Sequence, residues 1–151
     1  MNAAAFATRL RALLPALWLG MLATIALVAA PAAFALLPVH DAGRVAARML
    51  GIEARASLGF AVALFLIERQ RSRVAAAAGR GSVVSAELLL VLGALACTVA
   101  GHFAMLPMMD AARAGQGRWS FAALHAVSSA FYGVKALLVL ALAWRAARPP
   151  A

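Results

Sequence analysis

The chain has 151 residues, 66% of them hydrophobic, and its 14 Lys and Arg outnumber its 5 Asp and Glu, giving a formal net charge of +9. Soluble domains are only about 45–50% apolar, so this composition excludes an ordinary soluble fold. The basic residues flank apolar segments, which indicates contact with anionic lipid rather than with nucleic acid. The single cysteine, Cys97, excludes an intrachain disulfide.

Four apolar stretches, each of about 20 residues or more, are long enough to cross a bilayer as helices. Their residues do not alternate between apolar and polar, which excludes the strands of a membrane barrel. We therefore predict an all-α membrane protein, with residues 1–151 forming one domain, an antiparallel bundle of four transmembrane helices. The predicted helices cover residues 15–37, 41–67, 83–106 and 120–144, and a basic loop covers 68–82.

Local signals set the predicted helix ends. Pro38 and Pro107 are predicted to stop the first and third helices, because proline disfavours helix at the residue before it. Asp41 and Ser120 are predicted to cap the second and fourth. The basic residues before the first apolar stretch also fit a secretory signal, but the stretch is long for one, so a retained helix is predicted.

The arginines favour one orientation of the helices. Eight of them lie in the N-terminal tail, the 68–82 loop and the C-terminal tail, and four lie on the opposite side. Basic residues concentrate on the cytoplasmic side of a membrane, so both termini are predicted to be cytoplasmic. The eight are Arg9, Arg11, Arg69, Arg71, Arg73, Arg80, Arg145 and Arg148; the four are Arg44, Arg48, Arg113 and Arg118.

Two histidines, His102 and His125, lie inside the last two apolar stretches. In an antiparallel hairpin both would lie at one depth, roughly 6–8 Å inside the outer interface at about 1.5 Å per residue. Hydrogen bonding to each other or to Ser128 would make them structural, which is the favoured interpretation. Two imidazoles on facing helices would also suit the axial positions of a haem b.

The outer end of the third helix carries a possible soft-metal set, His102, Met105 and Met109. Imidazole and thioether groups suit copper(I). Methionine is also a common filler of apolar helices, and this second interpretation is the favoured one.

Polar residues elsewhere in the helices predict a network. Lys135, the only lysine, falls near mid-bilayer and needs a partner, for which Glu87 on the facing helix is predicted. A structural ion pair is favoured over a proton path through Glu87, Lys135, Tyr132 and His125. The predicted network comprises Glu53, Glu87, Ser128, Tyr132 and Lys135.

Two further patterns follow helical spacing. Arg44, Arg48 and Arg55 form a stripe on the second helix, which predicts contact with lipid phosphates or another anion. Small residues at intervals of four, Gly93, Cys97 and Gly101, predict a seam where two helices pack closely.

Several motifs of this chain carry a family resemblance. They are Leu17-Trp18-Leu19-Gly20, Ala30-Pro31-Ala32-Ala33-Phe34, Ala42-Gly43-Arg44-Val45, Gly101-His102-Phe103 with Pro107 and Met109, and Phe121-Ala122-Ala123-Leu124-His125-Ala126-Val127-Ser128. Their order and spacing resemble the bacterial four-helix family catalogued as domain of unknown function 4149, related to the eukaryotic transmembrane protein 205. The resemblance extends from about Pro15 to Trp144.

The resemblance implies a small, multi-pass helical protein of the bacterial inner membrane. More distant similarity to copper-resistance D proteins and to the haem-linked HemJ-type protoporphyrinogen oxidases implies a functional role for His102 and His125. The leucine-proline-arginine signature associated with those oxidases is missing, so the resemblance does not imply an oxidase.

Together these observations predict a structural, accessory or assembly-type membrane subunit rather than an enzyme. Its predicted partners are the lipid bilayer and other membrane subunits or further copies of the chain. Two alternatives stay open: a protein that binds haem b or copper through His102 and His125, and a proton-coupled enzyme or transporter that uses Glu87, Lys135 and His125.

Overall fold

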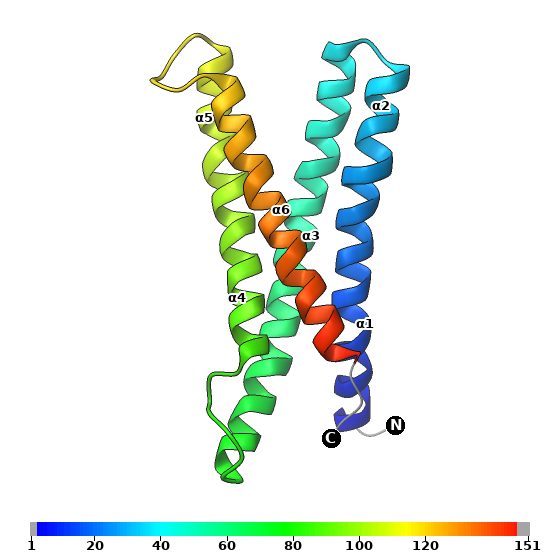
Figure 1. Ribbon diagram of the computed structural model, residues 1–151, viewed down its shortest axis with the longest axis vertical. Helices are drawn as coiled ribbons and strands as arrows, with labels where there is room; N and C mark the ends of the chain where they lie inside the picture. Colours follow the sequence, from blue (N-terminus) through cyan, green and yellow to red (C-terminus); the bar gives the residue numbers. More distant parts are fainter. Residues whose placement is uncertain (1–2, 148–151) are drawn as a thin grey trace.

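The computed structural model describes residues 3–147, and this part of the chain contains helices and no strands (Figure 1). Four helical segments are long and apolar enough to span a membrane. The predicted all-α membrane protein with four transmembrane helices is therefore confirmed. The segments are Phe6–Leu36, Val39–Ala77, Ala86–Arg113 and Phe121–Ala146. Arg148 of the predicted cytoplasmic tail lies outside the described residues.

Two of the four segments contain a wide π-helical turn. The first segment consists of α1 (Ala3–Thr24), η1 (Ile25–Ala29) and α2 (Ala30–Leu36). The third consists of α4 (Ala86–Thr98), η2 (Val99–Ala104) and α5 (Met105–Arg113). The second and fourth are the continuous helices α3 (Val39–Ala77) and α6 (Phe121–Ala146).

Proline explains both π-helical turns. Pro31 follows η1 and Pro107 follows η2, and neither proline has an N–H to donate to the carbonyl four residues earlier. A wide turn lets the helix pass this missing bond without stopping. The prediction that Pro107 ends the third helix is therefore wrong, since the helix continues to Arg113.

The other helix ends follow partly from capping. Ser120 caps α6 as predicted, its Oγ accepting a hydrogen bond from the backbone N–H of Ala123 at 3.2 Å. Asp41 does not cap α3, which begins two residues earlier, and it lies in the first turn instead. At its other end α3 continues to Ala77, so most of the predicted 68–82 loop is helical.

The helices form two hairpins in which consecutive segments run in opposite directions, and both ends of the described chain lie at the same end of the bundle (Figure 1). α1 packs against α3 and α6, and α4 packs against the same two helices. Consequently α3 and α6 lie diagonally across the bundle from each other. Toward the end formed by α2 and α5 the two hairpins diverge (Figure 1).

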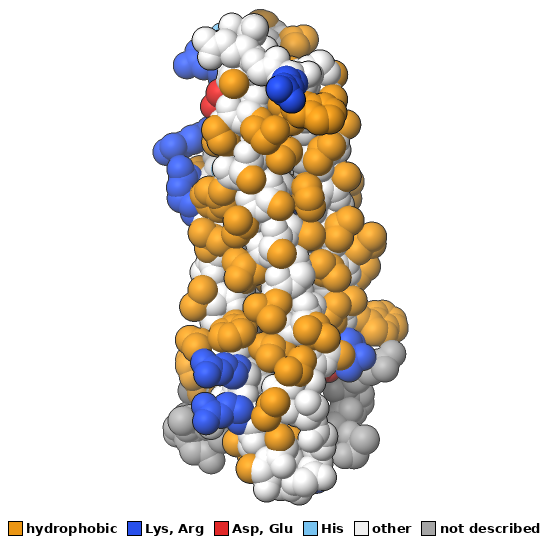
Figure 2. Space-filling model, turned by 90° about the vertical axis from the view of Figure 1, so that its left-hand side faces the viewer, with side chains coloured by type: hydrophobic (Ala, Val, Ile, Leu, Met, Phe, Trp, Pro, Cys, Tyr) orange, Lys and Arg blue, Asp and Glu red, His pale blue; other side chains and the backbone are white. Residues whose placement is uncertain are grey.

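The apolar core lies where all four segments pack together. Figure 2 shows that the outer face seen there is also hydrophobic in its middle, with Lys and Arg side chains gathered toward both ends. This distribution suits a protein whose middle contacts lipid and whose ends contact water. The core residues are Trp18, Leu22, Ala61, Leu64, Val91, Ala94, Val139 and Leu142.

The predicted small-residue seam is confirmed at two of its glycines. A Cβ on Gly101 would lie 2.6 Å from Cβ of Phe131, and one on Gly93 would lie 3.1 Å from Cδ1 of Leu138. Ser128 Oγ also donates a hydrogen bond to the Gly101 carbonyl at 2.6 Å. These contacts hold α4 and η2 closely against α6.

Replacing Gly101 by Ala should destabilise the protein, because the added methyl group overlaps Phe131 and forces the helices apart. The expected loss is about 1–3 kcal/mol of unfolding free energy, as for other overpacked sites. Gly133→Ala is the matched control, since a Cβ there meets nothing within 4 Å. Thermal unfolding in detergent, followed by circular dichroism, measures both; equal melting temperatures would contradict the close contact.

Candidate functional site

A buried ion pair joins α3 and α6 at the centre of the bundle. Nζ of Lys135 lies 2.7 Å from Oε1 and 2.9 Å from Oε2 of Glu53. The two side chains are only 3% and 2% exposed. Lys135 stands near the middle of the 26-residue α6, so the pair lies deep in the apolar part of the molecule. It connects the two helices that face each other diagonally.

The Glu53 carboxylate is held by a second donor from its own helix. Ser57, one turn further along α3, donates its hydroxyl hydrogen to Oε1 of Glu53. The Ser57 oxygen in turn accepts a hydrogen bond from Nε1 of Trp18 on α1, at 2.8 Å. Trp18 is fully buried and stacks on Phe60 with ring centroids 5.8 Å apart. The chain of contacts therefore extends from α6 through α3 to α1.

Tyr132 completes the surroundings of the lysine. Its ring centroid lies 4.7 Å from Nζ of Lys135, within the range of a cation–π interaction. Its hydroxyl donates to the Leu22 carbonyl of α1 at 2.9 Å. The ammonium group thus faces two carboxylate oxygens and an aromatic ring. We call Trp18, Glu53, Ser57, Tyr132 and Lys135 the central network.

The predicted pairing of Lys135 with Glu87 is wrong. Glu87 instead accepts a hydrogen bond from Nε of Arg145 at 2.9 Å. Arg145 lies ten residues beyond Lys135 on α6, or about 15 Å at 1.5 Å per residue. Glu87, in the first turn of α4, lies level with that end of α6 rather than with its middle. Ser128 is also outside the central network, because it bonds to the Gly101 carbonyl.

His102 and His125 occupy different surroundings. His102 is half-buried and makes an edge-on contact with the ring of its neighbour Phe103. His125 is exposed, and its ring stacks on Phe121 at 5.7 Å. Among residues 3–147 neither imidazole has a hydrogen bond to the other or to Ser128. A haem site formed by His102 and His125 stays a prediction, and no contact between the two side chains supports it within the described residues.

The soft-metal set receives no further support. Met109 is buried, whereas His102 and Met105 are only partly so. Within the described range, no group of three or more His, Cys, Asp or Glu side chains is placed to hold a metal ion. Copper binding by His102, Met105 and Met109 therefore stays a prediction from residue type alone.

The arginine stripe on α3 is exposed along its whole length. Nη1 of Arg55 donates to the Gly51 carbonyl at 2.7 Å, and Nη1 of Arg44 lies 3.8 Å from Asp41. For Arg48, between them, the described residues provide no such partner. These positions are compatible with the predicted contact to lipid phosphates, which stays a prediction.

Two members of the central network were not predicted. Trp18 resembles a residue of the aromatic belt at a membrane surface, yet it is fully buried, unlike Trp119 and Trp144. Ser57 carried a usable signal, because it follows Glu53 by four residues and therefore shares its helix face.

Four apolar helices held together by a buried polar network define a multi-pass membrane protein. Residues 13–118 match the family described as a domain of unknown function (DUF4149), and the chain belongs to that family. The match includes Glu53 and Ser57 and ends before α6, which carries Lys135. No curated protein matches the chain, and no solved structure does.

Removing one charge of the ion pair should destabilise the bundle strongly. Glu53→Gln or Lys135→Met leaves its partner buried without a counter-charge, at an expected cost of about 3–5 kcal/mol. The double variant E53Q/K135M should recover much of that loss, because no charge is then left unpaired. A thiol-reactive dye that detects exposure of Cys97 during heating measures the unfolding.

Glu87→Gln is the control for the Glu53 and Lys135 variants, because the Glu87–Arg145 ion pair lies nearer the surface. Its expected cost is at most about 1 kcal/mol. Additive losses in the double variant E53Q/K135M would contradict a coupled pair at the centre of the bundle.

Trp18→Phe tests the contact with α1. The change keeps an aromatic ring but removes the indole donor to Ser57, for an expected loss of about 1–3 kcal/mol. Trp144→Phe should be neutral, because Trp144 is 66% exposed. Chemical unfolding in mixed micelles compares the two variants, and indistinguishable midpoints would contradict a structural hydrogen bond at Trp18.

Proposed function

We propose that this protein is a structural or accessory subunit of the bacterial inner membrane, which works by assembling with copies of itself or with other membrane proteins. The observation that carries the proposal is the closed central network. Both oxygens of Glu53 bind Lys135, and the ammonium group also lies 4.7 Å from the centroid of the Tyr132 ring. The charges are therefore used to hold helices together.

A closed network suits a scaffold better than a catalyst. A catalytic or transporting group must exchange partners during its cycle, whereas each polar member of this network already has a partner within the bundle. Polar contacts between membrane helices fix their mutual arrangement. A fixed four-helix unit then offers its long apolar outer faces to lipid and to neighbouring subunits.

The proposal also includes the orientation of the helix bundle in the membrane. Arg11 belongs to α1, Arg71 to the last part of α3 and Arg80 to the loop before α4, and all three line one cavity. Figure 1 shows that the α3–α4 loop lies at the same end of the bundle as the chain termini. Basic residues favour the cytoplasmic side, so we place this end in the cytoplasm.

A proton-coupled enzyme or transporter is the second candidate. In this candidate Glu53 replaces Glu87 as the acidic residue next to Lys135 in the proton path. One observation favours it: the imidazole of His102 is half-buried within the apolar segment Ala86–Arg113. Ionisable groups inside a membrane protein often form proton paths. Haem or copper binding through His102 and His125 has less support, because His125 is exposed and turned to Phe121.

The scaffold proposal predicts a defined assembly without proton transport. Native mass spectrometry of the protein, extracted with its surrounding lipid, should show a stoichiometric complex with itself or another membrane protein. A monomer alone would contradict the proposal.

Proton flux separates the two candidates. Vesicles of phosphatidylethanolamine and phosphatidylglycerol, loaded with a pH-sensitive dye, should show the same flux with and without the protein. The control is the charge-free variant E53Q/K135M in the same vesicles. A pH-driven flux in the unmodified protein that disappears in the variant would overturn the scaffold proposal in favour of the second candidate.

A further inference from the structure

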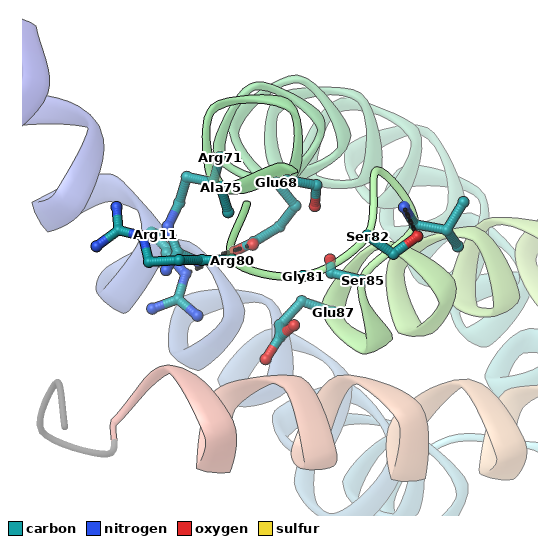
Figure 3. A pocket seen from close by; sticks show the side chains of 11 residues that line it. Arg11, Glu68, Arg71, Ala75, Arg80, Gly81, Ser82, Ser85 and Glu87 are labelled. Carbon is teal, nitrogen blue, oxygen red and sulfur yellow. Dashed lines mark hydrogen bonds and ion pairs between the residues drawn. The ribbon is translucent and has the colours of Figure 1, made fainter. Parts of the chain in front are cut away.

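A cavity of about 320 Å³ lies at the end of the bundle that carries the termini, between α1, the end of α3 and the start of α4 (Figure 3). Its volume falls in the roughly 300–1,000 Å³ range of small-molecule sites. Loop residues 80–82 on its rim are exposed, so the cavity is accessible from outside. The lining combines arginine, glutamate and serine side chains with apolar ones such as Ala75 and Val84. The central network is not part of it.

Three guanidinium groups give the cavity a positive side. Arg11, Arg71 and Arg80 lie together on one side of it, with Glu68 reaching toward them from α3 (Figure 3). Nε of Arg11 lies 2.7 Å from Oε1 of Glu68, and Nη1 of Arg71 lies 3.0 Å from its Oε2. Glu68 is 1% exposed, so it acts as a buried anchor that orients two arginines.

The anchored arginines keep free donors. Arg11 uses only Nε and Arg71 only Nη1 toward Glu68, which leaves their other N–H groups for a ligand. Arg80 has no ion-pair or hydrogen-bond partner for its side chain among the described residues. Glu87, the second carboxylate of the lining, points toward α6, where Arg145 neutralises it (Figure 3). The balance of charge facing the cavity is therefore positive.

Ser72 supplies an independent observation. Its side chain lines the cavity, the residue is 6% exposed, and its buried Oγ has no hydrogen-bond partner in the described part of the chain. Buried hydroxyl groups in proteins nearly always have a partner, so one that lacks it calls for a bound molecule. A ligand oxygen in the cavity would satisfy this hydroxyl.

We propose that this cavity binds a phosphate group, carried either by a lipid headgroup or by a free phosphate compound. Guanidinium groups bind phosphate oxygens in pairs, and three of them converge here. The start of α4, with Ser82 and Ser85 at the lining, adds the positive end of a helix dipole. Basic pockets between the ends of membrane helices are suited to anionic headgroups.

The binding test uses the full-length protein in neutral detergent and native mass spectrometry. The probe is dioleoyl phosphatidic acid, and dioleoylglycerol, which has the same chains without phosphate, is its control. Phosphatidic acid should bind in a one-to-one complex, and dioleoylglycerol should not. Equal binding of the two lipids would overturn the proposal. Failure of both lipids to bind would also overturn it if inorganic phosphate, tested with the Arg80→Gln variant as its control, does not bind either.

Matched variants test the site itself. Arg80→Gln should weaken binding about tenfold or more, the effect of one charged hydrogen bond. Arg73→Gln, an exposed arginine of α3 outside the cavity lining, carries the same charge change and should alter binding less than about twofold. Ser72→Ala should weaken binding several-fold without loss of stability, because its hydroxyl has no partner among residues 3–147. Equal effects of the two arginine variants would indicate general surface charge and overturn the proposal.

Competition identifies the source of the phosphate. If millimolar inorganic phosphate displaces the lipid, or binds alone with the same dependence on Arg80, the site takes free phosphate compounds. If it does neither while phosphatidic acid binds, the ligand is a lipid headgroup. Either result supports a phosphate site, and neither depends on the assembly proposed above.

Discussion

The ion pair between Glu53 and Lys135 is the interaction on which the arrangement of this protein depends. A charge buried in an apolar environment is tolerated only when a counter-charge and hydrogen bonds satisfy it. Because the two residues stand on diagonally opposed helices, the pair forms only when α3 and α6 converge on the centre of the bundle. Trp18 and Tyr132 extend the same requirement to α1, so three of the four segments are fixed by one set of polar contacts.

The third segment is held by packing instead. Gly101 and Gly93 allow α4 and η2 to approach α6 closely, and Ser128 adds a hydrogen bond to the Gly101 carbonyl. The wide turn before Pro107 continues this segment to the far end of the molecule, where the hairpins diverge. Polar contacts at the centre thus hold the first, second and fourth segments together, and close packing at small residues holds the third segment against the fourth.

The two polar regions differ in a way that separates their proposed roles. In the central network every polar side chain is paired within the bundle, which suits a structural element. At the end near the termini, Arg80 and the Ser72 hydroxyl have no partner within residues 3–147, and both line a cavity. Unused donors around open space are typical of a binding site, whereas satisfied donors in a packed core are not.

The sequence by itself determined the four spanning helices, because the length and apolarity of each stretch depend on nothing beyond the chain's own residues. It also determined the glycine seam and the Ser120 cap, which follow from spacing along one helix. The partner of Lys135, the burial of Trp18 and the different surroundings of His102 and His125 were decided by tertiary structure. Each depends on the rotation of a helix about its axis and on which helices are neighbours or diagonal. Local spacing does not encode those quantities, since they arise only when all the helices pack together.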